Sequence, residues 1–287
     1  MNKLFGLAVA ATMSMTSMLA LADRPNMLSD ERVRQAIAYA IDMDTIVDTL
    51  FEGKAIVADS MIPNGGFKAE GLEPYSYNPD KARALLSAAG WDGSQKLDVV
   101  YYYGDQLTVD LMVALQAYLA DVGIEMTYRK LEGDVSGQLN ALPEPGSDTS
   151  AVTYDIAYGA RAALALQEYY NGYRSGRSSY APGNPERDKL IDRINASADP
   201  DVQREAFMDF QRFESTMLSD IPLYYQQLFI YESNRMSRNG GEYGNDQFTY
   251  DWNIVNWTVE PDANGKEVLY TNTAPTSFFH HPWLNPG

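Results

Sequence analysis

The sequence predicts an α/β fold with parallel strands, followed by an irregular C-terminal extension. Two observations support this prediction. Between residues 29 and 232, segments with helical spacing of apolar residues alternate with short apolar strand-like runs, joined by short links. From residue 233 onward, glycine and asparagine accumulate, and only short strand-like pieces such as 253–259 are expected.

The first two helices are predicted from their capping residues. Ser29 can cap a helix with one apolar face, and Asp42 or Asp44 offers a new cap for a second, shorter helix. Gly53 closes that second helix. Residues 59–77 contain prolines and glycines throughout and are expected to form a long loop.

A strand–helix–strand unit forms the centre of the predicted fold. It is preceded by a helix over residues 80–89, for which Asn78-Pro79 supplies a cap and a proline in the first turn. The unit itself consists of a strand at 97–103, a helix at 107–122 and a strand at 124–130. Because the links are short, the two strands are expected to lie parallel in one sheet.

The later elements follow from the same kinds of pattern. In order, we expect a flexible loop at 143–152, a strand at 154–159, an aromatic-rich helix or loop at 164–173, a turn-rich stretch at 175–185, helices at 185–196 and 200–218, and an extended strand at 221–232. Further on, Asp262-Ala263-Asn264-Gly265 is expected to be a turn, because the glutamate that completes a calcium-binding loop is missing downstream.

Composition excludes several classes of function. With 22 Lys+Arg against 39 Asp+Glu, the net charge is −17, which argues against a nucleic-acid partner. There is no cysteine, so thiolate metal sites, disulfides and lipid attachment through cysteine are excluded. The two histidines, His280 and His281, are adjacent; a structural tail is expected there, with metal capture as the alternative. Without the usual catalytic or nucleotide-binding motifs, we expect a non-enzyme that needs no cofactor.

The N-terminus predicts export. Lys3 precedes an apolar stretch over residues 4–21, and Ala20-Leu21-Ala22 matches a cleavage site, so residues 1–22 are expected to be a signal peptide. An uncleaved membrane anchor is the alternative. We therefore expect a periplasmic product that is soluble and not lipid-anchored.

Two tyrosine clusters are candidate ligand contacts. Tyr101, Tyr102 and Tyr103 end one strand, and Tyr169, Tyr170 and Tyr173 follow another. Aromatic rings can stack on sugars or peptide side chains, and their hydroxyl groups can hydrogen-bond a ligand. The alternative is that about half of each cluster belongs to the core. Arg161 could clamp a carboxylate, or it could form a surface ion pair.

Five stretches resemble a known family and occur in that family's order. They are residues 30–42 (DERVRQAIAYAID), 77–91 (YNPDKARALLSAAGW), 121–124 (DVGI), 184–191 (NPERDKLI) and 221–225 (IPLYY). Together they resemble the peptide-type solute-binding proteins of ABC transporters, extracellular solute-binding protein family 5. That family handles oligopeptides, dipeptides, nickel chelates and some oligosaccharides.

The resemblance implies a periplasmic-binding-protein-like lobe. Residues 23–225 match the family's second lobe, residues 226–287 match the segment that returns to the first lobe, and the first lobe itself is largely missing. The implied function is non-catalytic capture of an oligopeptide or oligosaccharide and its delivery to an ABC permease. A separate chain that supplies the first lobe is a further expected partner. The alternative is an inactive remnant or a non-transport interaction module without a complete cleft.

The resemblance also implies a ligand-binding loop. In peptide-binding relatives, the loop after the strand that matches 154–159 carries an acidic residue that grips the peptide's amine. Here the loop begins Gly159-Ala160-Arg161 and contains no acid. The expected ligand-binding residues are therefore Gly159, Ala160, Arg161, Tyr169 and Tyr170, which suit an anionic or sugar-like ligand.

Overall fold

The computed structural model describes residues 26–63, 65–142, 151–160, 166–177, 181–227, 233–239 and 254–267. The chain divides into two units, Met1–Gln226 and Gln227–Gly287. The predicted signal peptide, most of the loop at 143–152, Arg161 and both histidines lie outside the described residues. Within the described part, no helix is long and apolar enough to span a bilayer.

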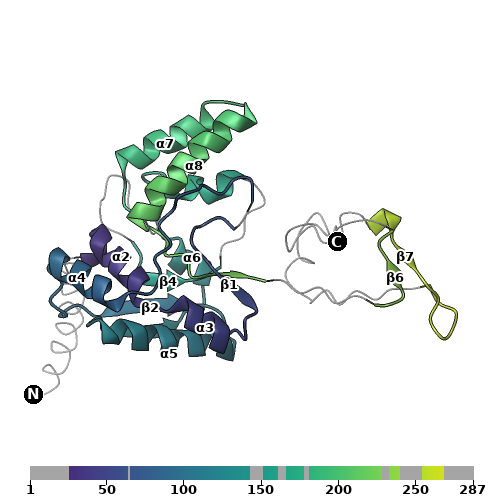
Figure 1. The fold of residues 1–287 in the computed structure, drawn as a ribbon, viewed down its shortest axis with the longest axis horizontal. Helices are drawn as coiled ribbons and strands as arrows, with labels where there is room; N and C mark the ends of the chain where they lie inside the picture. The colour runs from purple at the N-terminus through teal and green to yellow at the C-terminus, as the bar shows by residue number, and fades with distance from the viewer. Residues whose placement is uncertain are drawn as a thin grey trace, which may run out of the picture. The chain divides into compact units, whose positions relative to one another are not determined.

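A three-stranded parallel sheet with strand order β3-β2-β4 forms the centre of the first unit (Figure 1). Its strands are β2 (Leu97–Tyr101), β3 (Met126–Lys130) and β4 (Ile156–Tyr158), and α5 (Gln106–Asp121) connects β2 to β3. The expected strand–helix–strand unit with parallel strands is thus confirmed. Leu97 and Val100 in β2 and Leu111 in α5 are fully buried, because apolar helices cover this short sheet.

Three helices early in the described chain share one apolar core with this sheet: α2 (Glu31–Ala40), α3 (Met43–Thr49) and α4 (Pro79–Ala89). Asp42 caps α3 and Asn78 caps α4, as expected. The expected cap of α2 is wrong by one residue. Ser29 belongs to a short 3-10 turn, η1 (Met27–Ser29), and the Asp30 side chain accepts the hydrogen bond from the Arg32 amide instead.

Two long helices, α7 (Pro185–Asn195) and α8 (Pro200–Met217), pack against each other around a second apolar cluster (Figure 1). Asn184 and Asp199 cap them, and proline occupies the first turn of each. Phe207 and Phe210 of α8 are fully buried in this cluster. The aromatic-rich segment at 164–173 forms two 3-10 helices against it, η2 (Leu166–Tyr169) and η3 (Asn171–Tyr173).

Among the described residues, the elements that were not expected include β1 (Ala55–Val57), α6 (Val135–Leu139) and β6 (Met236–Ser237). β1 pairs antiparallel with β5 (Tyr224–Gln226). The strand expected at 221–232 is shorter than predicted at its start, and residues 228–232 lie outside the described residues. A three-residue strand has no periodicity of its own to detect, so only its distant partner makes it a strand.

In the second unit, β6 pairs antiparallel with β7 (Thr258–Val259), and η4 (Ile254–Asn256) precedes β7. The predicted turn at Asp262 is confirmed. The Asp262 carbonyl accepts from the Gly265 amide at 2.9 Å, and its carboxylate accepts from the Asn264 and Lys266 amides. The Asp262 carboxylate thus takes the ordinary place of an aspartate in a turn.

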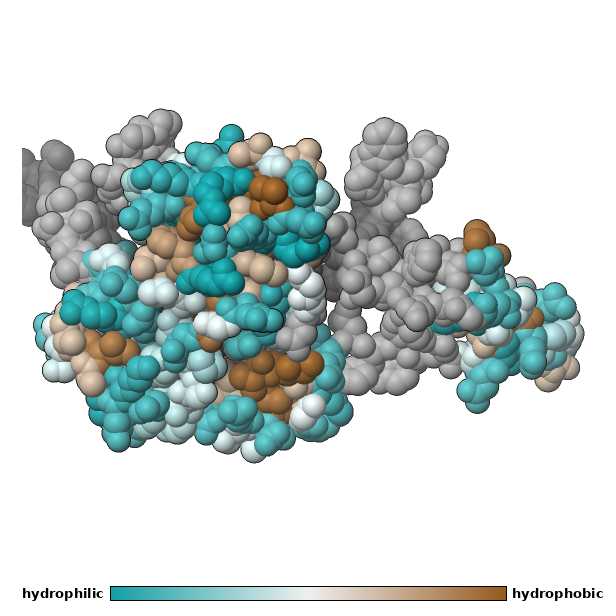
Figure 2. Space-filling model, turned by 45° about the horizontal axis from the view of Figure 1, so that its top comes forward, coloured by the Kyte–Doolittle hydropathy of each residue, from teal (hydrophilic) through white to brown (hydrophobic). Residues whose placement is uncertain are grey.

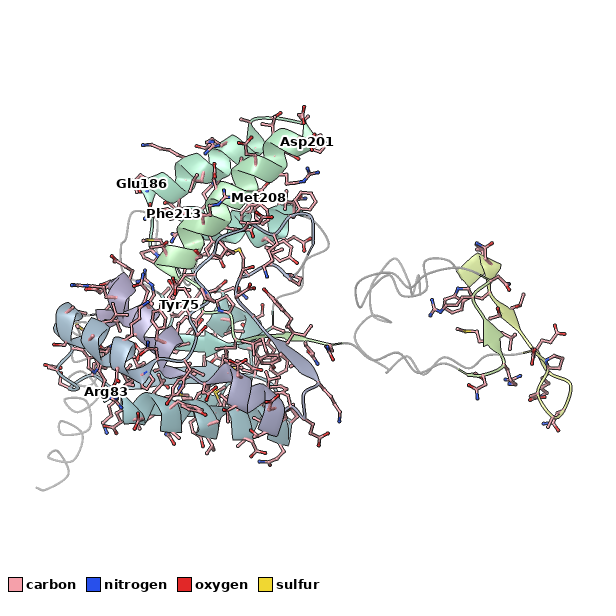
Figure 3. The ribbon with its side chains drawn as sticks, viewed as in Figure 1. Tyr75, Arg83, Glu186, Asp201, Met208 and Phe213 are labelled. Carbon is pink, nitrogen blue, oxygen red and sulfur yellow. The ribbon has the colours of Figure 1, made fainter. Side chains whose placement is uncertain are left out.

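The visible surface of the described residues is largely polar. In Figure 2, hydrophilic residues cover much of the visible face of the described chain, with compact hydrophobic patches between them. Figure 3 shows Arg83 on α4, where its guanidinium bonds the Asp121 carboxylate at 2.6 Å and ties α4 to the end of α5.

Candidate functional site

The carboxyl ends of β2 and β4 meet at one edge of the central sheet. Tyr101 and Tyr158 are partners in the parallel register, so the residues that follow them leave the sheet side by side. From β2 the chain turns toward β3 on one side, whereas β4 lies on the other side of β2. In open sheets of parallel strands, ligands bind outside such a point, where the strand order reverses.

Tyr103 joins the two strand ends directly. The backbone amide of Ala160 donates a hydrogen bond to the Tyr103 hydroxyl at 3.0 Å. The hydroxyl groups of Tyr102 and Tyr103 are also 3.0 Å apart, and the centres of their rings are 4.3 Å apart. The loop that follows β4 is therefore held against the two tyrosines that follow β2.

Gly159 allows this close approach. A Cβ atom at this position would lie 3.0 Å from Tyr102 Cε1 and 3.2 Å from the Tyr102 hydroxyl. Any larger residue would push the Tyr102 ring away. Glycine at 159 thus lets Tyr102 rest on the end of β4.

Two further tyrosines extend this cluster to β5. The hydroxyl groups of Tyr158 and Tyr224 are 2.5 Å apart, and Tyr158 meets Tyr103 edge to face at 6.0 Å between ring centres. The Tyr224 ring lies 4.4 Å from the ring of Phe51. No local pattern marks Tyr158 or Tyr224 as site residues, because their contact spans 66 positions of the chain.

Burial raises the pKa of three phenols in this cluster. It raises the pKa of Tyr102 to about 12, and the hydrogen bond with Tyr103 adds to the effect. Burial likewise raises the pKa of Tyr158 and of Tyr224. Tyr102, Tyr158 and Tyr224 thus present uncharged hydroxyl groups, which can both donate and accept hydrogen bonds.

Two charged side chains at this edge, Asp105 and Lys130, lie in different surroundings. The Asp105 carboxylate caps α5, and its pKa is lowered mainly because the Thr108 backbone amide donates to it. Lys130 is the last residue of β3, and its ammonium group lies beside Gly104, in the loop that follows β2. A Cβ atom added to Gly104 would lie 3.0 Å from Lys130 Nζ. The edge thus combines a carboxylate that already accepts hydrogen bonds from Thr108 with the ammonium group of an exposed lysine. This mixture of groups suits a polar organic solute.

The expected site residues separate into two places. Gly159 and Ala160 lie at the strand ends with Tyr102 and Tyr103, whereas Arg161 is outside the described residues. Tyr169 and Tyr170 pack on Phe207 of α8, with ring centres 6.4 and 6.1 Å away.

Burial distinguishes core tyrosines from site tyrosines. Tyr170 is only 4% exposed, and its hydroxyl donates to Asn195 Oδ1 at 2.8 Å, so little of its ring is accessible to a ligand. The interpretation that part of each tyrosine cluster belongs to the core is confirmed for Tyr101, Tyr170 and Tyr173. Among the described residues, no group of three His, Cys, Asp or Glu side chains is placed to hold a metal ion.

The model of one protein family, bacterial extracellular solute-binding proteins, family 5 Middle, matches residues 2–182. The chain belongs to this family. A Brucella ovis protein described as an ABC transporter peptide-binding protein is 38% identical over 112 residues, which are 36% of this chain and 20% of that relative. The nickel-binding periplasmic protein of Escherichia coli is 32% identical over 126 residues, 42% of this chain and 24% of that relative.

Solved structures of family members share the fold. The oligopeptide-binding protein AppA of Bacillus subtilis, solved with a nonapeptide, matches with a TM-score of 0.61 at 20% identity. The match covers 81% of this chain and 48% of AppA. The chain therefore spans about half of that structure, and the matched segments span about a quarter or less of the two curated relatives.

Proposed function

We propose that the chain is a non-catalytic solute-binding component of an ABC-type importer and that it holds an oligopeptide or oligosaccharide at the carboxyl ends of β2 and β4. Membership of the family supports the general role. The observation that carries the location is the convergence of Tyr102, Tyr103, Gly159 and Ala160 where the strand order reverses.

The chemistry of this edge suits such a solute. Tyr102 and Tyr103 are half-buried, and the accessible part of their rings can stack on a sugar or on a peptide side chain, while their hydroxyl groups can bond amide or hydroxyl groups. Among the described strands, β4 has a neighbour in its sheet only on the β2 side. Its other edge can therefore add backbone hydrogen bonds to an extended peptide.

Further partners belong to the same proposal. The bound solute is delivered to an ABC permease after export of the chain to the periplasm. A complementary lobe, on a longer polypeptide or on a separate chain, covers the other face of the solute. The coverage of AppA supports this lobe, because the match spans only 48% of the length of AppA. Enclosure from both sides is what gives a small-molecule site its affinity.

Thermal unfolding of the chain against libraries of oligopeptides, oligosaccharides and nickel chelates tests this proposal. A ligand at 100 times its Kd stabilises the native state by about 2.7 kcal/mol, which is a visible shift. We expect one ligand class to raise the Tm, and Tyr102→Ala to abolish the shift.

Tyr128→Phe is the matched control. Tyr128 lies in the middle of β3, opposite Val99 of β2 and on the other side of β2 from β4, and it is not one of the residues that carry the proposal. Two results would contradict the proposal: a cooperative unfolding transition whose Tm no ligand class raises, or a ligand-induced rise in Tm that is also seen in Tyr102→Ala.

A further inference from the structure

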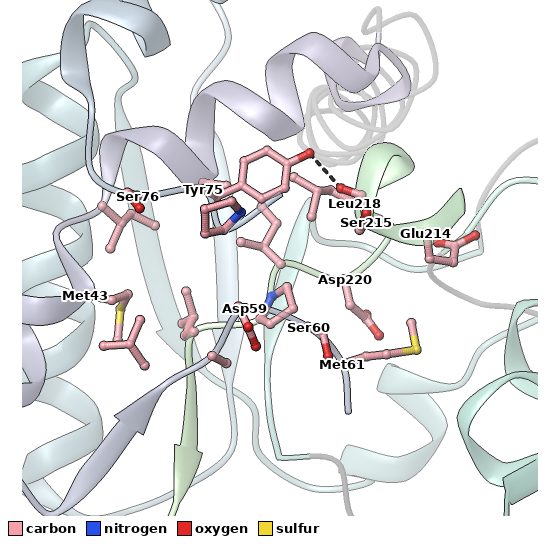
Figure 4. Close-up of a pocket in the computed structure, with 18 of the residues that line it drawn as sticks. Met43, Asp59, Ser60, Met61, Tyr75, Ser76, Glu214, Ser215, Leu218 and Asp220 are labelled. Carbon is pink, nitrogen blue, oxygen red and sulfur yellow. Dashed lines mark hydrogen bonds between the residues drawn. The ribbon is translucent and has the colours of Figure 1, made fainter. Parts of the chain in front are cut away.

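A cavity of about 200 Å³ lies in the first unit, apart from the tyrosine cluster at the ends of β2 and β4, none of whose residues lines it. Its walls come from α2, α3, the loops after β1 and before α4, the end of α8, and the segment before β5 (Figure 4). Ile41 and Met43 belong to the apolar cluster around the sheet, whereas Met61 packs against the cluster of α7 and α8. The cavity therefore lies where the two clusters meet.

The lining of this cavity is largely apolar. Five of the described lining residues are apolar and at most 8% exposed: Ala38, Ile41, Met43, Ala58 and Leu218. A molecule of liquid water occupies about 30 Å³, so the cavity can hold a considerably larger molecule. An apolar molecule that enters it removes its own surface and that of these side chains from water.

The Tyr75 ring gives the cavity an aromatic wall. Its hydroxyl donates to the Ser215 carbonyl at 2.6 Å, and its ring centre lies 4.9 Å from that of Tyr39, so the ring is held in place (Figure 4). Met43 and Met61 line the same cavity, and methionine sulfur makes favourable contacts with aromatic rings. These three side chains suit a ligand that carries an aromatic ring.

The carboxylates of the lining do not favour a charged ligand. Glu214 pairs with Arg187, and Asp59 pairs with Lys68, each at 2.5 Å. Asp44 and Asp59 are exposed, so water already solvates them. A cation would lose its hydration for carboxylates that already have a counter-charge or lie in water, and an anion would be repelled.

Two further polar groups of the lining are bonded within the protein. The Asp220 carboxylate accepts a hydrogen bond from the Tyr173 hydroxyl. The side-chain amide of Gln211, which is 2% exposed, donates to the Phe67 carbonyl at 2.6 Å. The lining therefore offers a ligand mainly apolar and aromatic contact.

We propose that this cavity binds a small neutral molecule with one aromatic ring, which lies against Tyr75, Met43 and Met61. An apolar cavity of about 150 Å³ is large enough to bind benzene, so this cavity accommodates one ring with a short substituent. Because the walls come from both apolar clusters, the bound ring also stabilises the junction between them. The proposal concerns a site separate from the tyrosine cluster and does not depend on solute binding there.

An NMR titration of the full chain with benzyl alcohol tests the proposal. We expect one molecule per chain, saturable shifts of the methyl signals of Met43 and Met61, and nuclear Overhauser effects from the ligand's ring protons to these methyl groups. Benzylamine and benzoate have the same skeleton with a positive and a negative charge, and should bind at least tenfold more weakly. Cyclohexylmethanol, which has no aromatic ring, should also bind more weakly.

A variant that fills the cavity tests the location. Ala38→Leu adds volume to a lining residue on α2 and should weaken the binding of benzyl alcohol at least tenfold. Ala117→Leu is the matched control, because it makes the same change at an exposed position of α5 that does not line the cavity. If Ala38→Leu fails to fold, the nuclear Overhauser effects in the unmodified chain still locate the ligand.

Three results would overturn the proposal. The first is the absence of saturable binding, or nuclear Overhauser effects that reach neither Met43 nor Met61. The second is binding of benzylamine, benzoate or cyclohexylmethanol as tight as that of benzyl alcohol. The third is a folded Ala38→Leu variant that binds benzyl alcohol as tightly as Ala117→Leu does.

Discussion

The ion pair between Arg187 and Glu214 connects α7 to α8 in the interior of the first unit. The two side chains are 3% and 2% exposed, and their closest atoms are 2.5 Å apart. Arg187→Met keeps much of the side-chain volume but leaves the Glu214 carboxylate buried without its counter-charge. Removing one member of a buried ion pair typically reduces stability by about 3–5 kcal/mol.

The structure places the loss from Arg187→Met toward the upper part of that range. The substitution also removes the donors to the Pro182 carbonyl and to the Ser219 hydroxyl. For domains of this size, each kcal/mol shifts the Tm by about 2–4 °C, so a loss of about 4–5 kcal/mol should lower the Tm by roughly 8–20 °C. Urea unfolding followed by circular dichroism measures the free energy directly.

A matched control separates burial from charge. Arg212→Met removes an exposed arginine on α8 that pairs with Asp209 at 2.9 Å. We expect this variant to lower the free energy of unfolding by at most about 1 kcal/mol. The double variant Arg187→Met/Glu214→Leu should recover most of the loss, because it leaves neither charge buried. If Arg187→Met costs less than about 1 kcal/mol, or the double variant is no more stable than the single one, the reasoning is wrong.

Three further predictions concern single residues. The pKa of the Tyr102 phenol is raised to about 12, so this phenol should ionise at higher pH than a free tyrosine. Because folding favours the neutral phenol, the contribution of Tyr102 to the free energy of unfolding should fall as pH rises from about 10 to 12. A spectroscopic titration compared with Tyr102→Phe would show this. Asn78→Ala removes the cap that accepts from the Lys81 amide at 2.9 Å and should cost about 1 kcal/mol in urea unfolding, so an unchanged midpoint would show that the cap adds nothing. Leu111→Ala, at a fully buried position in α5, should cost about 2–5 kcal/mol in the same assay, and a loss below 1 kcal/mol would contradict the packing described for β2 and α5.

The candidate solute site was only half visible in the sequence. Gly159 and Ala160 could be proposed because the sequence there resembles the family's ligand-binding loop, and the structure places them against Tyr102 and Tyr103. Tyr170 looked equally suitable, yet its ring is buried on α8. A tyrosine in a sequence does not show which way its ring faces, because burial depends on helices that pack from elsewhere in the chain.

The sequence by itself determined the local structure and the family. The caps at Asn78 and Asp199 and the parallel strands around α5 follow from hydrogen bonds and periodicities within a few residues. Only the tertiary structure decided the pairing of β1 with β5 and the contact of Tyr158 with Tyr224. These join segments that lie far apart along the chain, so they depend on how whole elements pack and not on any local pattern.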